Sequence, residues 1–104
     1  MIRSFHYAAL GRLLLNPNYR KEDFPRLEAW ARQWYHYVSR FFLTAYLDTV
    51  AGQAFVPSTE EGIKLLLRIY SLEKAIYEVG YEMNSRPDWL RIPVRGVLYL
   101  MEDF

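Results

Sequence analysis

Apolar residues recur at steps of three and four along almost the whole chain of 104 residues, and this spacing restricts the fold more than any other feature. Such steps return to one face of an α-helix, which turns once in about 3.6 residues. No segment alternates apolar and polar residues over a useful length, as a half-buried β-strand does. The sequence therefore predicts an all-α fold, a small bundle of three to four main helices that forms a single domain over residues 1–104.

Proline, glycine and capping residues mark where these helices begin and end. Asn16-Pro17-Asn18 should end the first helix, because proline restricts the preceding residue and donates no backbone hydrogen bond. Asp23 can cap the second helix, and Gly52 can end it. Ser58 or Thr59 can cap the third. The predicted helices cover residues 2–15, 23–51, 59–84 and a short last segment that starts at Pro93.

The overall charge and the residue types that are missing exclude several classes of protein. Thirteen Lys and Arg residues against twelve Asp and Glu give a net charge of +1, without the long basic run of a nucleic-acid binder. The absence of cysteine excludes disulfides, thiol nucleophiles and thiolate metal sites. No apolar run approaches the ~20 residues that span a bilayer, and basic residues interrupt the N-terminal segment where a signal peptide needs an apolar block. The sequence therefore predicts a cytoplasmic protein that binds neither nucleic acid nor membranes.

No catalytic or metal-binding centre is predicted. His6 and His36 belong to different predicted helices, and neither has further metal ligands at a suitable spacing. His6 is instead expected at the margin of the core, with its ring hydrogen-bonded. The serines lack the Gly-x-Ser-x-Gly motif of a nucleophile elbow, and the five glycines are too scattered to form a phosphate-binding loop.

The third predicted helix carries two faces of different chemistry. At about 100° of rotation per residue, six apolar residues fall on one stripe, which is expected to pack in the core: Leu65, Ile69, Leu72, Ile76, Val79 and Met83. Turned away from this stripe, within roughly 120°, lie tyrosines mixed with charged and amide residues: Tyr70, Glu73, Lys74, Tyr77, Gly80, Tyr81 and Asn84. We call this second set the polar-aromatic arc.

The residues of the polar-aromatic arc allow two interpretations. In the first it is an ordinary solvated surface, where Lys74 and Glu78 form an i,i+4 pair worth some tenths of a kcal/mol. Tyr77 and Tyr81 would then pack against Trp34 or Trp89, with their hydroxyls reaching water. In the second the arc binds a hydroxyl-rich small molecule, because carboxylate and amide groups bond to hydroxyls and a tyrosine ring stacks on the apolar face of a sugar.

Three segments of the chain match the pattern of one enzyme family. The most specific is LEKAIYEVGYEMNSRPDWLRIPVRG, residues 72–96, in which a helix leads into Arg-Pro-Asp-Trp and Ile-Pro. MIRSFHYAAL, residues 1–10, and the tryptophan-bearing LEAWARQWYHYVSRFFLTAYL, residues 27–47, extend the match over nearly the whole chain. Together they resemble the C-terminal end of bacterial maltokinases, including those fused behind trehalose synthase.

The resemblance implies the end of the C-terminal lobe of a two-lobed kinase of the aminoglycoside-phosphotransferase-like family. The nucleotide lobe, the catalytic-loop Asp and the metal-binding Asp of such kinases precede the portion matched here. The chain is therefore expected to be a fragment that needs a missing N-terminal kinase portion and binds no cofactor itself. The parent would be an ATP-dependent maltose 1-phosphotransferase that uses Mg²⁺, with a role in carbohydrate metabolism and glycogen biosynthesis.

In intact maltokinases this helical region helps to form the acceptor-sugar side of the cleft, so the resemblance points to maltose or a related sugar as the ligand. Among the matching positions, Glu78 and Glu82 rotate toward the edge of the polar-aromatic arc, and Arg86 could instead clamp the end of the helix. The predicted sugar-binding residues are Glu73, Lys74, Tyr77, Glu78, Tyr81, Asn84 and Arg86. No catalytic residue is predicted in this chain.

A second hypothesis is a stand-alone helical module for protein interaction or homo-oligomerisation. Aromatic residues make up 17 % of the chain, and rings that remain uncovered form apolar patches that drive self-association. The candidates lie on the less regular side of the second predicted helix: Tyr35, Tyr37, Phe42 and Tyr46.

Overall fold

The computed structural model describes residues 1–15 and 18–102, and these residues form helices and turns without any strand. Four α-helices follow one another: α1 (Ile2–Leu15), α2 (Phe24–Val50), α3 (Glu60–Ser85) and α4 (Arg91–Glu102). Short 3₁₀ turns, η1 (Lys21–Asp23) and η2 (Pro87–Trp89), precede α2 and α4. The predicted all-α bundle is therefore confirmed. Asn16 and Pro17, which were expected to end the first helix, lie outside the described residues.

Local capping chemistry explains the ends of the long helices. Thr59, one of the two residues predicted to cap the third helix, accepts a hydrogen bond at Oγ1 from the backbone N–H of Gly62 at 3.0 Å. Gly52 follows the end of α2, as predicted, with a φ of 82° in the left-handed region that favours glycine. The prediction for Asp23 is wrong, because its side chain makes no capping hydrogen bond. Asp23 ends a 3₁₀ turn in a helical conformation, whereas a capping residue needs an extended one.

The last helix begins earlier than its proline indicates. α4 starts at Arg91, two residues before the predicted start at Pro93. Pro93 is tolerated there because the first turn of a helix contains backbone N–H groups that have no intrahelical partner, so a missing N–H costs little.

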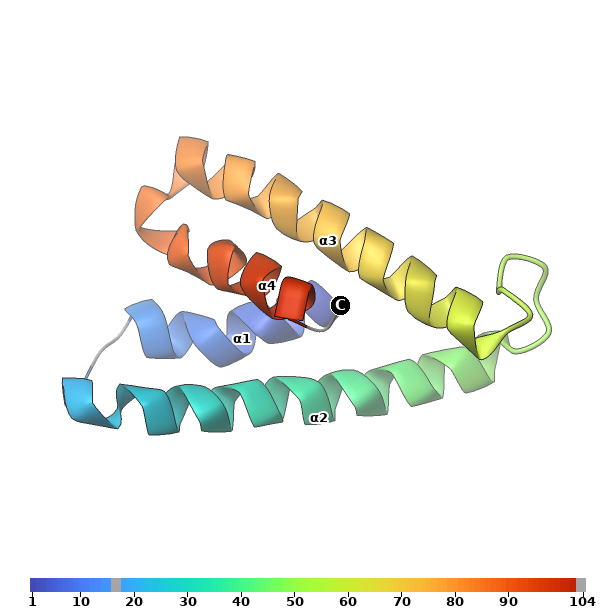
Figure 1. Cartoon of the computed structure of the whole chain (residues 1–104), viewed down its shortest axis with the longest axis horizontal. Coiled ribbons are helices and arrows are strands. Elements are labelled where there is room, and N and C mark those ends of the chain that lie inside the picture. Colours follow the sequence, from blue (N-terminus) through green and yellow to red (C-terminus); the bar gives the residue numbers. More distant parts are fainter. Residues whose placement is uncertain (16–17, 103–104) are drawn as a thin grey trace.

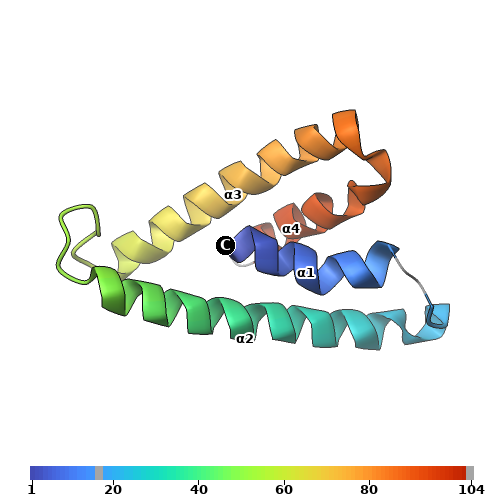
Figure 2. The ribbon, with the colours of Figure 1, turned by 180° about the vertical axis from the view of Figure 1, so that it is seen from behind.

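α1 and α4 lie between the two long helices, α2 and α3 (Figure 1, Figure 2). α1 packs on α2 and on α4, and α4 packs on α3, whereas α2 and α3 diverge and make no close backbone contact in the described residues. The core where the helices meet is small and consists mainly of Leu10, Leu14, Ile92 and Tyr99. The halves of α2 and α3 nearest the loop that joins them therefore have no helix between them (Figure 1).

The chain is more extended than a compact domain of its length, and it exposes more surface. Its radius of gyration is 15.2 Å, whereas a compact domain of this length has about 13 Å. Its accessible surface is 7647 Å², compared with about 6,200 Å² for a compact protein of the same size. Many large apolar side chains of α2, α3 and α4 contribute to this excess, because they stand on the surface.

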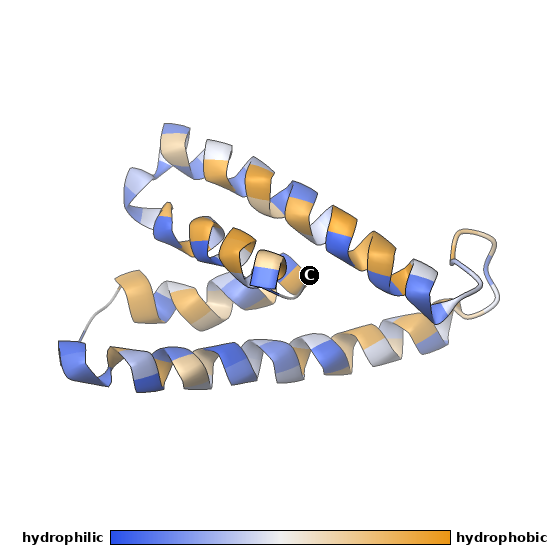
Figure 3. Ribbon diagram, in the orientation of Figure 1, coloured by the Kyte–Doolittle hydropathy of each residue, from blue (hydrophilic) through white to orange (hydrophobic). Residues whose placement is uncertain are grey.

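The predicted core stripe of α3 is wrong in its placement, although hydrophobic positions do recur turn after turn along this helix (Figure 3). The positions of α3 that are sealed from solvent are Ala75 and Glu82, both 0 % exposed. Four of the six stripe residues are instead 48–59 % exposed, namely Leu65, Ile69, Ile76 and Met83. The spacing of apolar residues identifies a stripe but not what covers it. The buried positions Ala75 and Glu82, on the side of α1 and α4, lie about 80–100° around the helix from the stripe.

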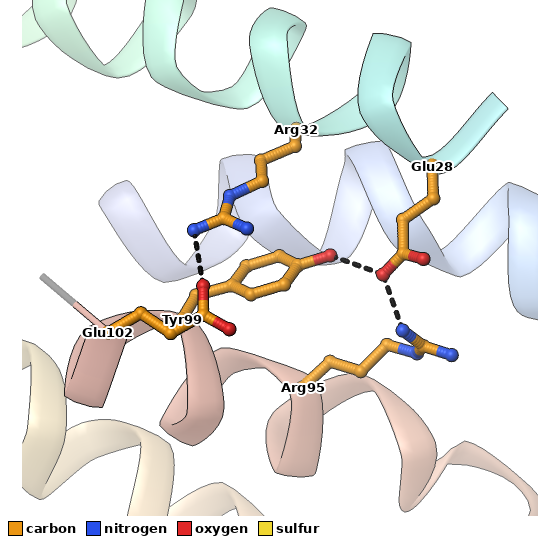
Figure 4. A network of polar contacts seen from close by, with 5 residues as sticks. All are labelled: Glu28, Arg32, Arg95, Tyr99 and Glu102. Carbon is orange, nitrogen blue, oxygen red and sulfur yellow. Dashed lines mark hydrogen bonds and ion pairs between the residues drawn. The ribbon is translucent and has the colours of Figure 1, made fainter. Parts of the chain in front are cut away.

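Long polar side chains bridge α2 and α4, whose backbones do not approach each other closely in the described residues (Figure 4). Glu28 Oε1 accepts hydrogen bonds from the Tyr99 hydroxyl at 2.6 Å and from the Arg95 guanidinium. Arg32 donates to Glu102 at 2.8 Å, and its guanidinium lies 4.2 Å from the centre of the Tyr99 ring. Burial, and then the bond to Glu28, raise the pKa of Tyr99 to about 12, so the phenol is neutral at pH 7. The network holds α4 against α2.

Candidate functional site

The polar-aromatic arc forms the outer face of α3, and part of it is hollowed. Tyr70, Glu73, Lys74 and Tyr77 line a depression with a volume of about 480 Å³ that opens to solvent. These four residues meet because steps of three and four return to one face of a helix. Three of them, Glu73, Lys74 and Tyr77, belong to the predicted sugar-binding set.

Aromatic rings continue along this face beyond the depression. The rings of Tyr77 and Tyr81 have their centres 6.5 Å apart and are inclined by 23°. Lys74 Nζ lies 4.8 Å from the centre of the Tyr77 ring, at a distance where an ammonium is attracted to the ring face. Tyr77 is 62 % exposed and Tyr81 is 50 % exposed, so both rings are open to solvent. Packing against Trp34 is excluded because α2 and α3 make no close backbone contact in the described residues, and the Arg86 guanidinium lies 5.8 Å from the Tyr81 ring centre and 3.8 Å from that of Trp89.

Asn84 and Arg86 lie at the end of α3 and are held by local bonds. Asn84 Nδ2 donates to the carbonyl of Gly80 at 3.0 Å. Arg86 donates to Glu82 Oε1 at 2.8 and 3.1 Å, and its guanidinium carbon lies 3.8 Å from the centre of the Trp89 ring. Arg86 therefore clamps the end of the helix, which was the alternative role considered for it.

Glu78 is separated from the rest of the predicted set. Its Oε1 accepts a hydrogen bond from Arg3 Nε on α1 at 2.7 Å, and the side chains of Glu78 and Arg3 are only 15 % and 7 % exposed. Glu82, one turn further along, is fully buried and pairs with Arg86. These two carboxylates lie on the inner side of α3, where they join α3 to α1 and to its own C-terminal end. They do not line the depression.

Helical spacing placed Tyr70 in the polar-aromatic arc, but the predicted sugar-binding set left it out, although it lies three, four and seven positions before Glu73, Lys74 and Tyr77. Arg3 was not predicted to have a role in the fold. Arg3 meets Glu78 from 75 positions away, and no local pattern indicates such a pair.

A second and larger hollow, about 1010 Å³, lies where α1, α2 and the end of α4 meet. Three buried side chains at its floor have polar atoms without a hydrogen-bond partner in the described residues: Arg3 Nη2, both ring nitrogens of His6, and Ser39 Oγ. These atoms are sealed from solvent, so a ligand in the hollow could not reach them without a rearrangement. The depression on α3 is therefore the better candidate site, because its polar groups are accessible.

His6 differs from its prediction. It is 1 % exposed, so it lies inside the core and not at its margin, and its ring nitrogens have no hydrogen-bond partner in the described residues. The ring meets the edges of Tyr35 and Tyr99 at centre distances of 5.3 and 5.6 Å. Burial, and then the positive charge of Arg3, lower the pKa of His6 to about 3. The imidazole is therefore neutral at pH 7.

Within residues 1–15 and 18–102, no group of three or more His, Asp or Glu side chains is arranged to hold a metal ion. None of the helices in this part of the chain has the length and apolar character needed to cross a membrane. No model of a known protein family matches the chain, and no solved structure matches it either.

Proposed function

We propose that this chain forms the C-terminal part of a maltokinase-like sugar kinase and supplies the acceptor-sugar side of its cleft, without catalytic machinery of its own. Maltose or a related sugar is the ligand, and the parent is a cytoplasmic enzyme. Phosphoryl transfer needs a phosphate cradle, carboxylates that hold Mg²⁺ and a base near the acceptor hydroxyl. The proposal assigns these parts, together with ATP, to an N-terminal kinase portion.

The observation that carries the proposal is the depression on α3, which combines the groups that sugars require. The Glu73 carboxylate can accept hydrogen bonds from two sugar hydroxyls, and the Lys74 ammonium can donate to a third oxygen. The exposed rings of Tyr70 and Tyr77 offer apolar faces against which a sugar ring can stack. Tyr81, Asn84 and Arg86 extend this surface toward the end of α3, where a second sugar ring would lie.

A maltose titration followed by two-dimensional NMR tests the site. We expect millimolar affinity, because one face of the cleft acts alone, with the largest shifts at residues 70–81. Lys74→Met and Tyr77→Ala should weaken binding several-fold. Lys64→Met, at the other exposed lysine of α3, and Tyr37→Ala, at an equally exposed tyrosine of α2, should leave it unchanged. Shifts confined to residues remote from α3, or equal losses in both pairs of variants, would show that the site is wrong.

An activity assay tests the second half of the proposal. The purified chain, incubated with ATP, Mg²⁺ and maltose, should form no maltose 1-phosphate. Detectable product that scales with the concentration of the chain would contradict the assignment of catalysis to an N-terminal portion.

A second candidate function, a helical interaction module, is favoured by the exposed aromatic side chains of α2. Tyr37 and Tyr46 of the predicted set are 66 % and 47 % exposed. Tyr35 is buried, and Phe42 packs edge-on against Phe5 with ring centres 5.6 Å apart. The predicted set therefore does not form one surface. The exposed apolar residues that recur along α2 are Trp30, Trp34, Tyr37 and Phe41.

A further inference from the structure

The stripe of α3 that was expected in the core has the spacing of a coiled coil. Its residues follow one another at steps of four, three, four, three and four, and we call them the α3 seam: Leu65, Ile69, Leu72, Ile76, Val79 and Met83. In a heptad of positions a to g this places isoleucine or methionine at a and leucine or valine at d. Six consecutive a and d positions are apolar, over a helix length of about 27 Å.

We propose that the α3 seam pairs with the same seam of a second copy of this chain, as a parallel two-stranded coiled coil. This interface lies beside the proposed sugar surface and shares Glu73 with it, whereas Tyr70, Lys74 and Tyr77 point away from the seam. The residue types at the a and d positions favour this partner, because β-branched Ile at a together with Leu at d favours two parallel strands. Ile69 and Ile76 occupy two of the three a positions, and Leu65 and Leu72 occupy two of the three d positions.

The α3 seam is available to a partner in the structure. The three a residues, Ile69, Ile76 and Met83, are 48–59 % exposed. Full burial of an isoleucine or methionine side chain stabilises a protein by about 1.5–3 kcal/mol, so covering these residues would be favourable. The centre of the seam lies about 80–100° around the helix from Ala75 and Glu82, which face α1 and α4. A second α3 can therefore lie beside α4 without displacing it.

In a parallel pair, the charged residues beside the α3 seam of one copy face residues of opposite charge in the other copy. Position g of one helix faces position e of its partner five residues later in the sequence. Arg68 occupies a g position and Glu73 the e position five residues on, so opposite charges meet twice in a symmetric dimer. Gly80 occupies the next e position, where an added Cβ would meet nothing within 4 Å, so its lack of a side chain leaves room for a partner helix.

The exposed area is sufficient for such an interface. The accessible surface of 7647 Å² exceeds that of a compact protein of this size by about 1,400 Å². A standard stable interface covers roughly 800 Å² on each partner. One symmetric contact along α3, with adjoining residues of α4, would therefore cover more than half of the extra accessible surface. Such an excess is unusual for a monomer.

The aromatic row of α2 is the competing surface. Trp30, Trp34, Tyr37 and Phe41 also follow steps of four and three. This row lacks the β-branched residues at a and leucines at d that favour two parallel strands, so it does not specify a two-stranded coil. The experiments below separate the two surfaces.

Sedimentation equilibrium over roughly a hundredfold range of micromolar concentrations should show a monomer–dimer equilibrium. The double change Ile69→Lys and Ile76→Lys should weaken dimerisation at least tenfold, because it places four like charges in the seam. Both side chains are about half exposed, so the helical circular dichroism of the monomer should be retained. The matched control, Trp34→Lys with Tyr37→Lys on α2, should leave the dimer intact. A strictly monomeric chain, or a dimer that only the α2 changes disrupt, would overturn the proposal.

Cross-linking tests the parallel register, and the chain is suited to it because it contains no cysteine. Ile69→Cys and Met83→Cys, each alone, should form a disulfide-linked dimer on mild oxidation, since equivalent a residues face each other within the span of a disulfide. Lys74→Cys, on the outer face of α3, should remain a monomer on a denaturing gel. In an antiparallel pair a residues meet d residues at opposite ends of the seam, so cross-links that form only when Leu65→Cys and Met83→Cys chains are mixed would show that arrangement and refute the parallel one.

Discussion

Arg3 and Glu78 join α1 to α3 through one buried ion pair, with the Arg3 guanidinium lying against the backbone of α4. A Cβ atom at Gly96 would come within 2.6 Å of two guanidinium nitrogens, so only glycine leaves room for the arginine there. Removal of one partner of a buried pair costs about 3–5 kcal/mol, because the other charge is left without compensation. Glu78 therefore has a clear role in the fold, and loss of sugar binding on its substitution would not by itself identify it as a ligand residue.

His6 predicts a dependence of stability on pH. Its pKa is about 3 in the folded state, compared with 6.5 for an ordinary histidine. Its stabilising contribution is therefore complete above pH 6.5 and is lost as the pH falls toward 3, because only the unfolded chain takes up the proton. The groups around the ring are Arg3, Tyr35 and Tyr99, and none of them is a carboxylate that could stabilise the imidazolium.

Urea denaturation between pH 5 and 7 measures this effect before most carboxylates titrate. The free energy of unfolding should fall by up to about 1.4 kcal/mol per pH unit below pH 6.5. His6→Phe should remove this slope while keeping a ring between the two tyrosines. His36→Phe, at the exposed second histidine, should keep the slope. An identical slope in all three proteins would mean that His6 is not the group responsible.

At the scale of the element, the helix boundaries were accessible to sequence reasoning because they depend on neighbouring residues. The predicted ranges 23–51 and 59–84 differ from α2 and α3 by one residue at each end. The side of α3 that faces inward was not accessible, because it depends on where α1 and α4 lie. Apolar residues at steps of three and four are typical both of a stripe that packs on another helix of the same chain and of a stripe at a coiled-coil interface. Ala75 and Glu82 became the buried positions because α1 and α4 lie on that side.

The start of α3 allows a matched test of capping. Thr59 Oγ1 accepts the N–H of Gly62, whereas the neighbouring Ser58 makes no cap, although both residue types are good capping residues. Thr59→Ala should destabilise the chain by about 1 kcal/mol, and Ser58→Ala should change the free energy of unfolding by less than about 0.5 kcal/mol. Thermal or urea denaturation of the two variants measures whether Thr59 alone caps the helix. Equal effects would indicate that Ser58 shares the cap in solution.

At the scale of the whole molecule, stability should be unevenly distributed. The core lies where α1 and α4 meet the long helices, whereas the halves of α2 and α3 nearest their connecting loop have no helix between them (Figure 1). Segments with few buried apolar contacts open at a lower free-energy cost than the core. In a monomer, residues 44–50 and 60–68 should therefore lose amide protection in the same way, since neither long helix supports the other there.

A dimer formed through the α3 seam would break this equivalence, and hydrogen exchange at two protein concentrations can detect it. Pairing adds buried area along residues 65–83 and none along α2, so amide protection in α3 should rise with concentration while residues 44–50 remain unchanged. The increase should follow mass action, because only the folded seam binds its partner. The Ile69→Lys, Ile76→Lys variant should exchange alike at both concentrations. Protection that rises along α2 instead would place the contact between copies on α2, and protection that is independent of concentration throughout the wild-type chain would contradict any contact between copies.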